Sequence, residues 1–153
     1  MNVAIASRQR VRKINRRLLK QITTALLADV KIERADLGLH LVAAPEMTRL
    51  NESFLRHAGP TDVITFDYST PRPQSPEPGP QLHGEILIGV DEAVLQARKF
   101  GTSWQSEVVR YMVHGVLHLL GFDDASVGAR HKMKREENRR LRELSRRFPL
   151  SKL

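Results

Sequence analysis

Apolar residues alternate or cluster in short stretches at four places in the chain, which predicts four β-strands. Elsewhere they recur every three or four residues, which is typical of amphipathic helices. The predicted strands cover residues 2–6, 37–43, 63–66 and 84–90, and the predicted helices cover residues 9–28, a short segment from Pro45 to Phe54, and residues 91–100, 102–120 and 125–147. This order of elements predicts an α+β fold, in which helices cover a small mixed sheet of about four strands.

Helix boundaries are predicted from residues that satisfy the free backbone groups at helix ends. Asp91 can cap the start of its helix, and Thr102 with Gln105 forms a capping-box pair for the next helix. Gly101 and Gly121 suit the C-terminal ends of these two helices, where a left-handed residue is common.

The helix that ends at Gly121 is strongly apolar. Its apolar residues lie on nearly all sides of the helix: Trp104, Val108, Val109, Met112, Val113, Val116, Leu117, Leu119 and Leu120. A helix of this kind is usually buried, so we expect it to be the central helix of the core. The same helix carries His114 and His118, which makes it the candidate carrier of a metal motif.

The chain length of 153 residues fits one domain, covering residues 1–153. Residues 69–81 hold five of the eight prolines and predict an extended, solvated loop within it. There is no cysteine, which excludes disulfides and thiolate-ligated metal sites. No apolar run approaches the ~18 residues of a membrane span, and the N-terminus does not resemble a secretory signal. We therefore expect a cytoplasmic protein that does not bind membranes.

The formal net charge is +8, with 25 Lys and Arg against 17 Asp and Glu. This excess lies mainly in residues 8–20 and 130–147, near the two ends of the chain. A basic surface of this kind indicates a polyanionic partner, with nucleic acid first, although charged helix faces are often only solvated. Aromatic residues make up only 5% of the chain, so we expect recognition of the phosphate backbone more than stacking on bases.

Residues 114–124, HGVLHLLGFDD, have the spacing of a zinc site. His114 and His118 lie one helical turn apart on the same face, so both rings can reach one metal ion. Gly121 lets the chain reverse, and Asp124 then occupies the position of the third ligand in the long zinc-protease motif. His131, further along the chain, is the alternative third ligand, and Asp124 could instead cap the last helix, a role also open to Asp123 or Ser126.

Gly115 separates this motif from that of a zinc protease. In H-E-x-x-H proteases, the glutamate after the first histidine is the general base, and glycine cannot accept a proton. Gly115 is also expected to leave space for a bulky substrate beside the metal. A zinc hydrolase that acts on a phosphodiester therefore fits better than a peptidase.

The sequence resembles the YbeY endoribonuclease family in three blocks. The motif HGVLHLLGFDD resembles the family signature, and residues 50–68 and 83–97 (LNESFLRHAGPTDVITFDY and HGEILIGVDEAVLQA) resemble two further blocks in the same order. The resemblance implies an α+β fold, one Zn²⁺ ion held by His114, His118 and Asp124, and cleavage of single-stranded RNA. It also implies a role in ribosomal RNA maturation, at the 3′ end of the small ribosomal subunit, and in ribosome quality control.

Three positions depart from the family pattern. Asp124 replaces the usual third histidine, which should make the metal a slightly weaker Lewis acid. Leu55 aligns with an arginine thought to serve RNA cleavage, whereas Arg56 follows one residue later, so Arg56 is either a catalytic residue or a solvated loop cation. Glu85 replaces an aspartate and keeps its charge.

We therefore expect a zinc-dependent endoribonuclease whose partners are ribosomal RNA and the small ribosomal subunit. A zinc metalloprotease is one alternative, favoured by the spacing of the histidines and opposed by Gly115. A ribosome assembly factor with a structural metal is the other. The motifs leave the general acid, the general base and the oligomeric state undetermined.

Overall fold

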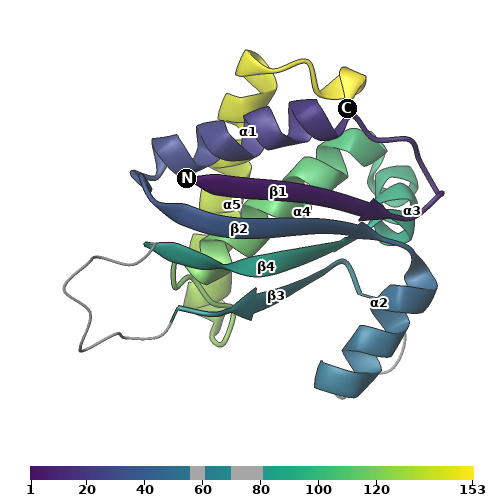
Figure 1. Ribbon diagram of the computed structural model, residues 1–153, viewed down its shortest axis with the longest axis horizontal. Helices are drawn as coiled ribbons and strands as arrows, with labels where there is room; N and C mark the ends of the chain where they lie inside the picture. Colours follow the sequence, from purple (N-terminus) through teal and green to yellow (C-terminus); the bar gives the residue numbers. More distant parts are fainter. Residues whose placement is uncertain (56–60, 70–80) are drawn as a thin grey trace.

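A four-stranded mixed sheet forms the centre of the computed structural model, which describes residues 1–55, 61–69 and 81–153 (Figure 1). The strands are β1 (Asn2–Arg8), β2 (Ala35–Val42), β3 (Val63–Asp67) and β4 (Leu82–Gly89), and their order in the sheet is β1-β2-β4-β3. Strands β1, β2 and β4 are parallel, and β3 is antiparallel to β4. The predicted α+β class and mixed sheet are confirmed.

Three helices lie on one side of this sheet. Helices α4 and α5 lie behind the strands in Figure 1, α1 lies alongside β1, and α4 contacts both the sheet and α5. Helix α3 packs against α4, and α2 follows β2 at the end of the sheet. The α-helices within the described residues are α1 (Arg16–Asp29), α2 (Ala44–Leu50), α3 (Val90–Phe100), α4 (Trp104–Leu119) and α5 (Val127–Arg147), with a π-helical turn at Asn51–Leu55 and a 3₁₀ turn at Leu150–Lys152.

Helix α4 is the central buried helix, as its apolar residues predict. The side chains of Val108, Val109, Met112, Val113 and Val116 are completely buried between the sheet and the neighbouring helices. This burial fixes the helix in position and orientation, so the polar side chains at its exposed edge are held on a rigid support. Across the described ranges, no helix combines the length and the apolar character needed to cross a membrane.

The two faces of β4 carry different residues because side chains alternate along a strand. Ile86 is completely buried and lies beneath α4. Leu87 belongs to a small second cluster with Val42, Met47 and Ile64 under α2. Glu85 shares the face of Leu87 and is therefore on the side of the sheet away from α4.

The first long helix starts later than its apolar pattern predicts. Helix α1 begins at Arg16, whereas the periodicity begins near residue 9. The Asn15 side chain caps α1 by accepting a hydrogen bond from the Leu18 amide, at 3.1 Å. Before it, the Gln9 side chain accepts from the backbone amides of residues 11 and 12, which holds that segment in a turn. Local capping therefore overrides an apolar spacing that extends beyond the helix.

Two predicted caps have other roles. Asp91 lies inside α3 and accepts a hydrogen bond from the Ala44 amide at 2.6 Å, which joins α3 to the start of α2. Ser103, and not Thr102, caps α4, and the Thr102 hydroxyl donates to Glu107. Most of the predicted proline-rich loop, residues 69–81, lies outside the described residues.

Candidate functional site

Two histidines face each other near the C-terminal end of α4. The Nε2 atoms of His114 and His118 are 3.1 Å apart, and the two rings are inclined at 75°. Nitrogen ligands lie about 2.0–2.1 Å from zinc in tetrahedral sites, which places two of them about 3.3–3.4 Å from each other. The separation of this pair therefore fits two ligands of one ion.

The environment of His118 favours its neutral form. Burial is the largest influence and lowers the pKa of the imidazole, and the adjacent His114 lowers it further. Asp124, a backbone hydrogen bond at Phe122 and Asp123 act in the opposite direction but do not reverse the shift. Neutral imidazole is the form that binds metal ions, so His118 is held in the state that a ligand requires.

Glu137 on α5 contacts the other side of the His114 ring. Its Oε2 atom lies 2.9 Å from His114 Nδ1, and its Oε1 atom accepts a hydrogen bond from Arg110 Nη1, also at 2.9 Å. Burial raises the pKa of Glu137, but hydrogen bonds with His114 and Arg110 and the charges of His114 and Lys134 produce a net lowering. An ionised Glu137 can only accept, so it places the His114 proton on Nδ1 and leaves Nε2 free for a metal.

Glu137 is a site residue that the sequence patterns alone do not identify. It is buried although it is charged, and it lies on the inward face of α5. The other buried residues of that helix are Met133, Leu141 and Leu144. A glutamate among the apolar residues on the buried face of a predicted helix could have indicated its role, since buried charges are normally paired.

The chain reverses directly after His118, as the motif predicts. Gly121 has a φ of +100°, and its amide donates to the His118 carbonyl at 3.0 Å. Asp124 follows in the exposed loop before α5. The Ser126 hydroxyl caps α5 by accepting from the Ala129 amide at 3.0 Å, so Asp124 is not needed as the cap.

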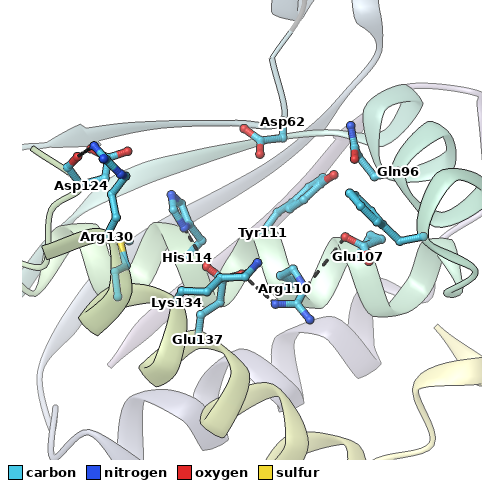
Figure 2. Close-up of a pocket in the computed structure, with 12 residues that line it drawn as sticks. Asp62, Gln96, Glu107, Arg110, Tyr111, His114, Asp124, Arg130, Lys134 and Glu137 are labelled. Carbon is cyan, nitrogen blue, oxygen red and sulfur yellow. Dashed lines mark hydrogen bonds and ion pairs between the residues drawn. The ribbon is translucent and has the colours of Figure 1, made fainter. Parts of the chain in front are cut away.

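A cavity of about 360 Å³ opens beside the histidine pair, of which His114 lines it and His118 does not (Figure 2). Asp124 and Arg130 lie beyond His114 at one end of it, and Tyr111 and Gln96 lie at the other. Its ionisable lining residues other than His114 and Tyr111 are the carboxylates Asp62, Glu107, Asp124 and Glu137 and the cations Arg110, Arg130 and Lys134. Among the described residues, the carboxylates therefore outnumber the cations by one.

The third predicted ligand is not assembled with the histidine pair. Over residues 1–55, 61–69 and 81–153, no three His, Asp or Glu side chains converge closely enough to hold a metal ion. Asp124 lines the cavity together with His114, and Arg130 donates to its backbone carbonyl at 3.3 Å. His131, the alternative ligand, is exposed on α5 and does not line the cavity.

Gly115 faces the sheet and not the cavity, which corrects the expectation that it leaves space beside a metal. A Cβ atom at this position would lie 2.7 Å from Cγ2 and 2.8 Å from Cδ1 of Ile86 on β4. The absent side chain therefore lets α4 pack closely on the sheet. A glutamate at this position would point into Ile86, so the fold has no room for the general base of a zinc protease.

The remaining candidates lie apart from the cavity or outside the described residues. Arg56 is among the residues that the structure does not describe. Glu85 lies on the other face of the sheet, where it accepts a hydrogen bond from the Tyr68 hydroxyl at 2.7 Å and lies 3.3 Å from His40 Nε2. Glu85 therefore contacts neither histidine of the pair.

Comparison with known proteins identifies one family. The family model described as Endoribonuclease YbeY matches residues 2–145. A protein named Endoribonuclease YbeY from Aquifex aeolicus is 32% identical over 143 residues, which cover 93% of this chain and 86% of the relative. A protein of the same name from Salinibacter ruber is 39% identical over 106 residues, covering 69% and 68% of the two chains. The solution structure of a Thermotoga maritima protein has the same fold, with a TM-score of 0.62 and 23% identity over 94% of this chain and 89% of that chain.

Proposed function

Because the chain belongs to the YbeY endoribonuclease family, we propose that it is a zinc-dependent endoribonuclease that cuts single-stranded ribosomal RNA. The proposed role is maturation of the 3′ end of small-subunit RNA and ribosome quality control in the cytoplasm. Family membership supports the reaction class, and the arrangement of the histidine pair beside a charged cavity supports the dependence on a metal.

The observation that carries the proposal is the approach of the two Nε2 atoms to 3.1 Å at the edge of this cavity. With Glu137 holding a proton on His114 Nδ1 and His118 neutral, the pair is suited to hold a cation. His114 and His118 would bind zinc, and Asp124, three residues past the reversal at Gly121, would complete the set after a movement of its exposed loop. Zinc bound in this way supplies Lewis-acid polarisation of a phosphoryl oxygen.

The charges of the cavity are consistent with a substrate that binds only together with a metal. Among the described residues that line the cavity, carboxylates outnumber cations by one, so these side chains alone attract a phosphodiester only weakly. A divalent ion at the histidine pair would reverse the sign of this balance. Arg130 and Lys134 lie on α5 at the side of the cavity, where they can contact the phosphates that flank the cut.

The packing of Gly115 on Ile86 argues against a peptidase of the H-E-x-x-H kind. Position 115 faces the sheet, so a glutamate there could not reach the cavity. Of the two glutamates in the described lining, Glu107 accepts a hydrogen bond from Thr102 and does not replace the missing base. Glu137 is the carboxylate in contact with the pair, and it is committed to His114 and Arg110.

Cleavage assays with two kinds of substrate test the proposal. Zinc-loaded protein is incubated with single-stranded RNA that contains a small-subunit 3′ end, and separately with casein, with and without a chelator. We expect RNA cleavage that the chelator abolishes and added zinc restores. His118→Ala should lose cleavage by at least about 100-fold, consistent with the loss of a metal ligand. His83→Ala, at a partly exposed histidine that does not line the cavity, is the matched control.

The two alternatives give different results in the same assays. Chelator-sensitive digestion of casein without RNA cleavage would identify a protease. Zinc that is needed for folding, in a protein that never cuts RNA, would identify an assembly factor with a structural metal.

A further inference from the structure

The hydroxyl group of Tyr111 is buried without a hydrogen-bond partner. Tyr111 lies on α4 one turn before His114, and its side chain is only 5% exposed. Its oxygen is the only buried side-chain nitrogen or oxygen atom in the described part of the chain that has no partner. Burying a hydroxyl without a partner costs free energy, so an exception of this kind at a cavity wall indicates a group that a ligand satisfies.

The surroundings of this hydroxyl keep it protonated. Burial raises the pKa of Tyr111 well above its ordinary value, and the charges of Asp62, Glu107 and Glu92 raise it further. The group is therefore a neutral hydroxyl that can both donate and accept. Figure 2 shows it directed toward Gln96, whose amide nitrogen donates to Glu92 at 2.8 Å and whose oxygen remains available as an acceptor.

The cavity has a different character at its two ends. Arg130 and Lys134 belong to the end near His114 and Asp124, where a phosphate is favoured. The end at Tyr111 has Asp62, Gln96, Glu107 and Arg110 nearby. Arg110 is paired with the carboxylates of Glu107 and Glu137, so the further carboxylate of Asp62 disfavours a phosphate there. The Tyr111 end instead suits an uncharged group that offers both donors and acceptors.

An exposed aromatic ring also lines this cavity. Phe100 at the end of α3 is 65% exposed, although burial is the usual state of phenylalanine. Bases of single-stranded RNA stack on such rings and present their edges to polar side chains. Phe100 is exposed and Gln96 partly exposed, so changes of rotamer can open the hydroxyl of Tyr111 to an entering base.

We propose that the Tyr111 end of the cavity binds one unpaired base of the RNA strand, which hydrogen-bonds to the Tyr111 hydroxyl and stacks on Phe100. This inference rests on the proposed function, since it takes RNA as the substrate. It adds a base contact to the recognition of the phosphate backbone that the basic segments predict, and it places that contact next to the site of cleavage.

Binding of RNA oligomers that each lack one base tests the inference. Zinc-loaded wild type and Tyr111→Phe are titrated by fluorescence anisotropy in the cold, and gel electrophoresis verifies that the RNA stays intact. We expect one position in the RNA at which removal of the base weakens wild-type binding by about three- to ten-fold or more. Loss of a single hydrogen bond accounts for the lower part of this range. Tyr111→Phe should weaken binding of the complete oligomer by about three- to ten-fold, and have little further effect once that base is absent.

Melting temperatures distinguish a ligand contact from a structural hydroxyl. Tyr111→Phe should leave the melting temperature of the free protein unchanged or slightly raised, because its hydroxyl has no partner to lose. Tyr68→Phe is the control, since it makes the same chemical change at a hydroxyl bonded to Glu85 on the other face of the sheet. It should leave the pattern of base dependence unchanged.

Unchanged RNA affinity in Tyr111→Phe would overturn the inference, with or without a lower melting temperature. The inference would also be overturned if, at every position, the loss of affinity from Tyr111→Phe added in full to the loss from removal of the base. Such additivity would indicate that Tyr111 contacts the RNA backbone. If the wild type cuts no RNA, the proposed function fails, but the binding measurements still decide whether the base contact exists.

Discussion

His114 Nδ1 lies 2.9 Å from Oε2 of Glu137, a buried carboxylate that is 23 residues further along the chain. The contact joins α4 to α5, and Arg110 holds the second carboxylate oxygen. In metal sites, a carboxylate in this position fixes both the orientation and the tautomer of the ligating histidine. Glu137 thus has the position of a residue that prepares His114 for metal binding.

Substitution of Glu137 should weaken zinc binding. We expect Glu137→Ala to lower zinc affinity by about 10- to 100-fold, because His114 loses the group that orients it. Glu137→Gln keeps an acceptor and should lose less. Competition with a chromogenic chelator measures the affinity. Glu136→Gln is the control, because Glu136 binds Arg139 and Arg140 and not His114, and an equal loss there would contradict the proposed role.

Substitution of Asp124 should affect metal binding but not the stability of the metal-free protein. The Asp124 carboxylate forms no hydrogen bond or ion pair with any of the described residues, so Asp124→Ala should change the unfolding free energy by less than about 0.5 kcal/mol. Its zinc content, measured by elemental analysis, should fall. Asp123→Ala, which removes an acceptor for the Ala125 amide, should retain zinc. Retained zinc in Asp124→Ala together with loss in His131→Ala would assign the third ligand to His131.

Addition of one methyl group at position 115 should destabilise the protein. Gly115→Ala places a Cβ atom 2.7 Å from Ile86, and we expect a loss of about 1–3 kcal/mol from overpacking in urea unfolding. Gly128→Ala is the matched control in α5, where a Cβ atom meets nothing within 4 Å. That change should be neutral or stabilising by up to about 1 kcal/mol, since alanine is the better helix former. Equal effects of the two substitutions would contradict the close packing of α4 on β4.

The ion pair between Arg8 and Glu46 should contribute stability that is lost in acid. Hydrogen bonding to Arg8 lowers the pKa of Glu46 below its ordinary value of 4.5. The folded protein therefore binds fewer protons than the unfolded chain, so the contribution is complete above about pH 4.5 and disappears as the pH falls through the lowered pKa. Glu46→Gln should cost about 0.5–1 kcal/mol at neutral pH and nothing at strongly acidic pH. Urea unfolding across this range measures the difference, and a constant difference would contradict the prediction.

The parts of the fold and site that the sequence predicts are those fixed by local spacing. Helical periodicity places His114 and His118 on one face, and Gly121 predicts the chain reversal. Both features depend only on residues that are close together in the chain. The contact with Glu137 depends on how α4 and α5 pack, and no spacing within either helix reveals it. The sequence patterns assign Tyr111 to neither the core nor the site, since only the packed structure shows that its hydroxyl lacks a partner.

The same distinction explains the predictions that were wrong. The apolar pattern of the first helix starts near residue 9, but the capping side chain of Asn15 makes the helix begin only at Arg16. Space beside the metal was inferred for Gly115 from its small size, whereas its direction depends on the position of β4. The direction in which a side chain points and the partner that it contacts depend on the packed molecule. Residue type and the spacing of apolar residues can be read from the sequence.

The contact between Gly115 and Ile86 also limits how this enzyme can change during evolution. Acquiring the glutamate of a zinc protease would need a substitution at position 115 and, at the same time, a smaller residue at position 86 or a displaced helix. Each single step passes through a less stable protein, so selection would remove it before any new activity appeared. The spacing between one helix and one strand therefore separates two hydrolytic chemistries that otherwise share a motif.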